Sequence, residues 1–143
     1  MILFVDIEGI LAQQCFRRAD TIFKHIILNK KNFAWIKSQN FERIFVVTNQ
    51  KGIGEGLLDE KLFNFQIGYV ARALELYTNT KVDVHYYPYE KPNGFLIKYI
   101  LKEFNIKKDN AVILGNRKNH KKDAALSGLK YIDAKKIKDE NQY

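Results

Sequence analysis

Short apolar runs that end abruptly at polar residues recur along this chain of 143 residues and constrain its fold more than any other feature. The runs are rich in β-branched and aromatic residues, as strands buried in a doubly covered sheet are. Segments with apolar residues at helical spacing separate them, so strand and helix alternate. The predicted strands cover residues 1–5, 41–48, 81–87, 111–114 and 130–133.

This alternation predicts an α/β fold. Because crossovers between parallel strands are right-handed, repeated strand–helix units give a Rossmann-like, doubly wound parallel sheet with helices on both faces. The first helical segment is expected over Arg17–Ser38, with a break near Asn29–Asn32. A second helix is expected to start at Asp59, a third to be capped by Asn93, and a short fourth to end at Gly128.

Composition bounds the classes of protein to consider. A hydrophobic content of 46% and 13% aromatic residues fit one globular domain, expected over residues 1–134, with a polar tail over 135–143. The single Cys15 excludes an internal disulfide, and without a Cys/His cluster no zinc site of the usual kind is expected. The chain has neither the layout of a signal peptide nor an apolar run of membrane-spanning length, which predicts a cytoplasmic protein without a membrane partner.

Polar residues at the strand ends are the candidate functional residues. The carboxyl ends of parallel strands meet at one edge of a sheet, so Asp6, Glu8, Thr48, Lys91 and Asn116 are expected to approach one crevice. Alternate residues leave a strand on the same side, and the first two carboxylates could form a nucleophile with an acid/base partner or half of a divalent-metal site. The alternative is a structural turn in which Asp6 caps the next segment.

Two further features each leave two interpretations open. The glycine-rich segment Lys51–Gly56 fits backbone approach to an anion, and it also fits a flexible surface loop. The formal net charge of +8, densest over Arg117–Lys122, favours anionic partners such as phosphate esters or nucleic acid. The same charge is compatible with a generally solvated basic surface.

Four motifs together resemble those of the haloacid dehalogenase (HAD) superfamily of phosphotransferases. Asp6–Gly9 resembles the DxDGT motif, and Val46–Gln50 with Gly52 and Gly56 resembles the second motif with its glycine-rich sequel. Lys91–Gly94 resembles the third. The fourth, GDxxxDxxAAxxxG, is matched by Leu114–Arg117 followed by Ala124, Ala125 and Gly128. The pattern is most similar to the branch with small caps, which contains histidinol-phosphate and heptose-bisphosphate phosphatases and polynucleotide 3′-phosphatase domains.

The resemblance implies a phosphomonoester hydrolase. Asp6 would attack phosphorus to form an aspartyl-phosphate, and Glu8 would protonate the leaving oxygen and then activate water. Thr48 would hydrogen-bond the transferring phosphoryl group, and Lys91 would neutralise charge on the nucleophile and the phosphate.

The resemblance also implies a bound Mg²⁺ and further phosphate contacts. The ion would be held by Asp6, the backbone carbonyl of Glu8 and Asn116, with Asp123 as a candidate additional ligand. Asn49, Gly52 and Arg117 are the candidate phosphate- or substrate-binding residues implied in the same way.

Two positions depart from the fourth motif: Asn116 and His120 stand where the family has acids. An asparagine oxygen can coordinate Mg²⁺ but contributes no charge, so metal affinity should fall. This leaves two hypotheses. The first is a Mg²⁺-dependent phosphatase, with the basic Arg117–Lys122 segment favouring a nucleic-acid or nucleotide end phosphate over a sugar phosphate. The second is a catalytically weakened protein that binds a phosphorylated ligand, nucleic acid or partner protein without turnover.

Overall fold

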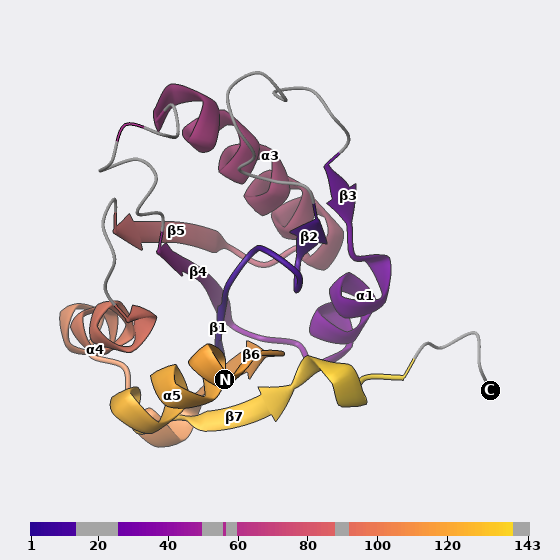
Figure 1. The fold of residues 1–143 in the computed structure, drawn as a ribbon. Coiled ribbons are helices and arrows are strands. Elements are labelled where there is room, and N and C mark those ends of the chain that lie inside the picture. The colour runs from indigo at the N-terminus through magenta and orange to yellow at the C-terminus, as the bar shows by residue number, and fades with distance from the viewer. Residues whose placement is uncertain (14–25, 50–55, 57–59, 88–91, 139–143) are drawn as a thin grey trace.

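The computed structural model describes residues 1–13, 26–49, 56, 60–87 and 92–138 (Figure 1). Two short 3₁₀ helices lie at Lys108–Asn110 and Ala134–Lys136. The strands and α-helices, in chain order, are β1 (Ile2–Val5), β2 (Ala12–Gln13), β3 (Ile27–Leu28), α1 (Lys30–Ser38), β4 (Arg43–Asn49), α3 (Glu60–Thr78), β5 (Val82–Tyr87), α4 (Asn93–Glu103), β6 (Ala111–Gly115), α5 (Lys118–Ser127) and β7 (Lys130–Asp133).

The predicted parallel sheet is present. Its five strands are ordered β5-β4-β1-β6-β7, and every neighbouring pair is parallel. The first strand is central, and its last residue, Val5, pairs with Val46 of β4 and Leu114 of β6. After β1 the chain therefore adds β4 and β5 on one side of it, and then β6 and β7 on its other side. In α/β proteins such a switch point, here between β1 and β6, is where ligands bind at the carboxyl ends of the strands.

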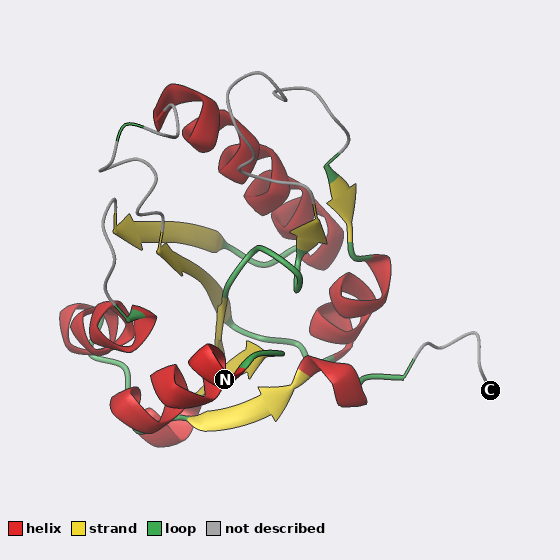
Figure 2. Ribbon diagram, viewed as in Figure 1, coloured by secondary structure: helices red, strands yellow, loops and turns green. Residues whose placement is uncertain are grey.

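Helices cover both faces of the sheet (Figure 2). Leu3 and Val5 point into a core shared with Phe33 of α1 and Phe63 of α3. Phe4 points to the opposite face, into a core shared with residues of α4. Because successive residues of a strand face opposite sides, an uninterrupted apolar strand requires cover on both sides, and the fold supplies it.

The helix expected over Arg17–Ser38 is wrong at residues 27–28. Ile27 and Leu28 form β3, which pairs antiparallel with β2, and the helix α1 begins only at Lys30. Asn29 is the N-cap: its side chain accepts a hydrogen bond from the Asn32 backbone N–H at 3.0 Å. The asparagines expected to break a helix therefore start one. Residues 14–25 lie outside the described part of the chain.

The expected cap of the third helix is also corrected. Pro92 occupies the N-cap position of α4, and Asn93 is its first helical residue. The Asn93 side chain is buried: its Nδ2 donates to the Val47 carbonyl of β4 at 3.4 Å, and its Oδ1 accepts from no N–H among the described residues. The first-turn N–H of Gly94 is satisfied by a side chain from another helix, because Asp123 of α5 accepts from it at 3.0 Å.

The described chain continues past β7 into the 3₁₀ helix Ala134–Lys136. Ala134 is buried, and the Asp133 side chain accepts from the Lys135 N–H at 2.9 Å to cap the 3₁₀ helix. Among the described residues, no helix combines the length and apolarity needed to span a membrane.

Candidate active site

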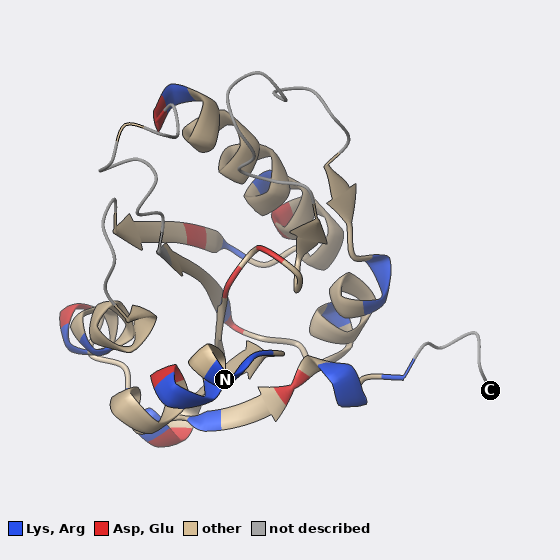
Figure 3. Ribbon diagram, viewed as in Figure 1, with Lys and Arg blue, Asp and Glu red and all other residues tan. Residues whose placement is uncertain are grey.

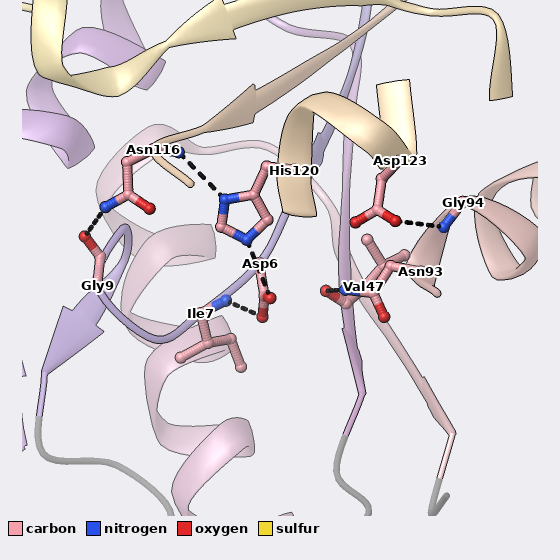
Figure 4. A network of polar contacts seen from close by, with 9 residues as sticks. All are labelled: Asp6, Ile7, Gly9, Val47, Asn93, Gly94, Asn116, His120 and Asp123. Atoms are coloured by element: carbon pink, nitrogen blue, oxygen red, sulfur yellow. Dashed lines mark hydrogen bonds and ion pairs between the residues drawn. The ribbon is translucent and has the colours of Figure 1, made fainter. Parts of the chain in front are cut away.

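Asp6 follows the last residue of the central strand and lies at the switch point of the sheet. Its Oδ1 accepts a hydrogen bond from the Ile7 backbone N–H at 2.7 Å, and its Oδ2 lies 3.3 Å from Nε2 of His120 (Figure 4). The side chain keeps 22% of its surface exposed. Asp6 is thus a carboxylate held by one donor on each oxygen yet still open to solvent on one side.

The turn after Asp6 is built on a single buried residue. The Ile7 carbonyl accepts from the backbone N–H groups of Ile10, Leu11 and Ala12, at 3.1, 2.9 and 3.2 Å. Ile7 and Ile10 are fully buried, and the Asn32 side chain of α1 donates to the Ile10 carbonyl at 2.9 Å. These contacts fix the turn from both sides and so fix the start of the loop that carries Asp6.

The hydrogen bonds of His120 assign its tautomer. Its Nδ1 accepts from the Asn116 backbone N–H at 3.1 Å. A backbone N–H can only donate, so Nδ1 carries no proton and the neutral ring has its proton on Nε2. That proton points to Asp6. The backbone at the end of β6 therefore makes His120 a hydrogen-bond donor to the candidate nucleophile.

Gly115 makes room for this histidine. A Cβ at position 115 would overlap the Cβ of His120 and lie 2.8 Å from its Cγ and 2.9 Å from Cε2 of Tyr131. These contacts involve a ring and a side-chain stem that cannot simply rotate away. Glycine at the end of β6 is therefore required for the imidazole to lie against the sheet edge beside Asp6.

Asn116 is held with its amide nitrogen toward the turn and its oxygen free. Its Nδ2 donates to the Gly9 carbonyl at 2.9 Å. Because that carbonyl can only accept, the other end of the amide must be the oxygen. Oδ1 is buried and has no hydrogen-bond partner among the described residues. A buried carbonyl-type oxygen without a donor is a group that a cation would satisfy.

The donor set at this edge fits Mg²⁺ in kind. Asp6 and Asn116 offer side-chain oxygens, and the Glu8 backbone offers a carbonyl on the same turn. Within the described residues, no cluster of three or more His, Cys, Asp or Glu side chains could hold a metal. A magnesium site here would therefore depend on amide and backbone oxygens around one carboxylate, a set with little charge.

Asp123 joins α5 to the start of α4. Its Oδ1 accepts from the Gly94 N–H in the first turn of α4 at 3.0 Å, and its side chain is buried. Burial raises the pKa of Asp123, while the hydrogen bond from the Gly94 N–H lowers it. The hydrogen bond shows what one oxygen of Asp123 does, and its role as a metal ligand stays a prediction.

The close packing of these two helices depends on Gly94. A Cβ there would lie 2.8 Å from Cδ2 of Leu126 and 3.1 Å from the Asp123 carbonyl oxygen. The glycine of the third motif therefore lets α5 approach the first turn of α4. This approach brings Asp123 to the Gly94 N–H.

The remaining predicted site residues are placed in part. Thr48 is the next-to-last residue of β4, toward the same edge of the sheet as Asp6, and is buried; Asn49 ends that strand. Arg117 is the N-cap of α5, with a guanidinium nitrogen 3.3 Å from where a Cβ of Gly9 would stand. The predictions for Lys91, Gly52 and a small cap fall on segments outside the described residues, except that Gly56 is described and has φ +73°.

Sequence reasoning missed the role of His120. It noted that His120 stands at an acid of the fourth motif but gave it no contact. A signal was present: His120 lies four residues after Asn116, so one turn of helix returns its ring to the end of β6. Asn93 was also missed as a buried link to β4, because it was expected to cap its own helix.

Solved structures share this fold. Over 91% of this chain and 78% of the other, a D,D-heptose 1,7-bisphosphate phosphatase from B. bronchiseptica, complexed with magnesium and phosphate, superposes with a TM-score of 0.71 at 17% identity. A putative HAD-like phosphatase from Mesorhizobium loti gives 0.69 at 22% identity, covering 90% of this chain and 68% of that one. A second heptose bisphosphate phosphatase, from Burkholderia thailandensis, gives 0.54 at 19% identity over 88% and 73%.

These likenesses define the class of fold. A parallel five-stranded sheet with an aspartate after its central strand is the arrangement of an α/β protein with its site at the switch point. More particularly, the chain has the HAD-like fold of the phosphatases named above. No protein-family model and no curated protein sequence matches the chain.

Proposed function

We propose that this protein is a phosphomonoester hydrolase that works through an aspartyl-phosphate on Asp6. The observation that carries the proposal is the placement of Asp6: an open carboxylate at the carboxyl end of the central strand, fixed by the Ile7 N–H and by His120. The HAD-like fold, shared with a phosphatase complexed with magnesium and phosphate, supports it.

In the first step, an oxygen of Asp6 forms a bond to phosphorus while the ester oxygen leaves. Glu8 supplies the proton that the leaving oxygen takes up. In the second step, Glu8 takes a proton from water, the water oxygen bonds to phosphorus, and the bond from phosphorus to Asp6 breaks. Inorganic phosphate and the original carboxylate result.

The other residues would bind and orient the phosphoryl group. Thr48 would donate from its hydroxyl, and Lys91 would balance the charge of the nucleophile and phosphate. Arg117, with Asn49 and Gly52, would contact the phosphate or the rest of the substrate. His120 donates a hydrogen bond from Nε2 to Asp6. This bond would hold the Asp6 carboxylate in one orientation and leave lone pairs on both of its oxygens.

The residues that would hold Mg²⁺ are Asp6, the Glu8 backbone carbonyl and Asn116, with Asp123 as the further candidate. A bound Mg²⁺ would supply charge neutralisation between the anionic nucleophile and the anionic phosphate. Asn116 is suited to this task because its amide nitrogen is tied to Gly9 and its buried oxygen is free.

We favour a nucleic-acid or nucleotide end phosphate as substrate. Arg117 is the N-cap of α5, and Lys118, Lys121 and Lys122 follow on its first turns with exposed side chains. The ribbon of α5 is accordingly largely blue in its first half (Figure 3). The same end of α5 carries His120, so a basic surface adjoins the candidate nucleophile. Lysines and arginines attract phosphate without reading sequence, which suits an enzyme that acts on a chain end.

A second function is favoured by the fourth motif: binding of a phosphorylated ligand without turnover. Where the family has two acids, this chain has an amide and an imidazole, and the imidazole already occupies one oxygen of Asp6. The donor set offers Mg²⁺ little charge. A binding protein would need the basic surface and the fold but no nucleophilic step.

One screen separates the two functions. Purified protein is assayed for phosphate release with Mg²⁺ or with EDTA, using an aryl phosphate, a 3′-phosphorylated oligonucleotide, histidinol phosphate and sugar bisphosphates. Release that needs Mg²⁺ and is lost in Asp6→Asn supports the hydrolase. No release from any substrate, together with oligonucleotide binding that weakens steeply with salt, supports the binding protein.

A further inference from the structure

Most of the net positive charge of the chain comes from its C-terminal part. Residues 93–136 contain eleven of the 24 Lys and Arg residues but only four of the 16 Asp and Glu residues, so they supply +7 of the formal net charge of +8. The rest of the chain is therefore nearly neutral. Residues 93–136 form α4, β6, α5 and β7, which lie together on one side of the structure (Figure 1). Such an asymmetry is typical of a surface that binds an anionic partner.

The exposed face of α4 carries aromatic rings between lysines. Phe95 and Tyr99 expose 43% and 58% of their surface, and Lys98 and Lys102 are exposed as well. Their spacing of i, i+3, i+4 and i+7 places all four on one face of the helix. These four residues form the α4 stripe. The opposite face of α4, which includes Ile100, packs against the sheet.

The α4 stripe begins beside the candidate active site. Asn93 donates to the Val47 carbonyl, one residue before the candidate phosphate ligand Thr48 (Figure 4). From there α4 runs back along β4, because Phe104 at its C-terminal end packs on Phe45 with the ring centroids 5.1 Å apart. The stripe therefore leads away from the site at about 1.5 Å per residue. The basic helix α5 packs against the first turn of α4.

The helix α3 provides a contrast. It also exposes aromatic rings, with Phe65 at 65% and Tyr69 at 51%, but its two basic residues are balanced by two acidic ones. It covers the other face of the sheet, which belongs to the nearly neutral part of the chain. Exposed rings next to an excess of positive charge are therefore a property of the side that α4 and α5 form.

Rings between cations are the groups with which proteins hold single-stranded nucleic acid, because bases stack on the rings while the lysines attract the phosphates. We infer that the α4 stripe binds a nucleic-acid single strand whose phosphorylated end lies at Asp6. A duplex offers the rings no free base, and an anionic membrane or an acidic peptide supplies charge without a series of flat rings. The inference rests on the proposed function for the position of the strand's end, and it deepens that function by naming the substrate class.

Fluorescence anisotropy with a labelled, 3′-phosphorylated strand of about 12 nucleotides measures the binding. The Asp6→Asn protein is the background for all variants, so that no turnover occurs. Tyr99→Ala is expected to weaken binding by about fivefold or more, because one base loses its stacking partner. Tyr99→Phe keeps the ring and should restore the affinity. Tyr69→Ala on α3 is the matched control and should leave the affinity unchanged, since Tyr69 is also an exposed helical tyrosine.

The dependence of binding on salt tests the lysines of the stripe. Lys98→Ala and Lys102→Ala should each reduce the slope of log K against log salt concentration by about 0.7, which is the contribution of one phosphate contact to a single strand. Tyr99→Ala should leave this slope unchanged, because stacking on a ring releases no counterion. Lys61→Ala, at an exposed lysine of α3, is the control for charge and should also leave the slope unchanged.

Two further ligands identify the partner. Tyr99→Ala should not weaken binding to the same strand annealed to its complement, and anionic phospholipid vesicles should compete poorly with the single strand. Equal loss of affinity for the duplex, vesicles that compete as well as the strand, or stripe variants that bind like their background would each overturn the inference.

The same proteins separate this inference from the hydrolase proposal. Release of phosphate from an aryl phosphate by the wild-type chain, without binding of the strand, would overturn the inference and leave the hydrolase standing. Binding of the strand that depends on Tyr99, without release from any substrate, would support the surface and contradict the hydrolase.

Discussion

Nε2 of His120 lies 3.3 Å from Oδ2 of Asp6, while Nδ1 of the same ring accepts the Asn116 backbone N–H at 3.1 Å. The end of β6 thus fixes a proton on the imidazole, and the imidazole fixes the carboxylate at the end of β1. Two strand ends that are neighbours in the sheet are connected through one side chain. The candidate nucleophile is oriented by a neutral donor where related motifs carry an acid.

His120→Ala should therefore lower kcat more than it changes KM. Removing the Nε2 donor lets Asp6 rotate, and we expect kcat to fall by about ten- to a hundredfold with KM within about twofold. Steady-state kinetics on the best substrate of the screen give both numbers. Asn119→Ala, at an exposed position on the same helix, is the control. An unchanged kcat in a folded His120→Ala would show that the contact does not orient the nucleophile.

Asn116→Asp should tighten Mg²⁺ binding and weaken the metal-free fold. A second carboxylate adds charge to the donor set, so the apparent Kd for Mg²⁺ is expected to fall by about five- to tenfold. The variant also loses the donor to the Gly9 carbonyl, now 2.9 Å from Nδ2, which costs about 1–2 kcal/mol without metal. Calorimetric Mg²⁺ titration and melting with and without Mg²⁺ measure both effects. Equal Mg²⁺ affinity in the two proteins would argue against position 116 as a ligand.

Gly115→Ala should destabilise the protein, because the added methyl overlaps His120 and Tyr131. Overpacking of this kind costs about 1–3 kcal/mol, and the displaced ring should lower activity as well. Gly68→Ala is the contrasting variant: a Cβ added at this position meets nothing within 4 Å, and the change should stabilise α3 by up to about 1 kcal/mol. Urea denaturation of both variants tests the opposite signs. Equal stability of Gly115→Ala and wild type would contradict the packing argument.

His85 should make the fold lose stability as the pH falls below 6.5. Burial lowers the pKa of His85 from its ordinary 6.5; Asp83 raises it and Arg43 lowers it, and the ring packs beside Phe45 and Phe104. Above pH 6.5 the ring is neutral in both states. Below it, the unfolded chain takes up the proton first, so stability falls until the pH passes the lower pKa of the folded state.

The measurement is the free energy of unfolding of wild type and His85→Leu between pH 7.5 and pH 4.5. The difference between the two proteins should shift in favour of the variant as the pH falls through this interval. Parallel curves would show that His85 has the same pKa in the folded and unfolded chains.

The sheet was predictable from sequence because its strands are continuous apolar runs, as Ile44–Val47 shows, and such runs need cover on both faces. The β2–β3 pair was not, because two-residue strands have no periodicity to detect. The prediction that Asp6, Thr48 and Asn116 lie at one edge of the sheet needed only the expectation that their strands are parallel, which the structure confirms.

The contacts among the site's side chains could not be read from sequence. The bond from His120 to Asp6 and that from Asp123 to Gly94 join residues far apart in the chain, at a spacing set by close helix packing. That packing depends on Gly115 and Gly94, whose missing side chains leave no periodic signal. A motif can therefore indicate which residues gather at an edge, and only the packed structure shows which of them touch.

Covalent trapping tests the central claim, nucleophilic attack by Asp6, most directly. The protein is mixed with Mg²⁺ and the best substrate of the screen, treated with borohydride, digested and analysed by mass spectrometry. An aspartyl-phosphate is reduced to homoserine, so the account predicts homoserine at position 6, dependent on substrate and absent in Asp6→Asn. Substrate turnover with Asp6 unmodified, or with the reduced residue at another position, would contradict it.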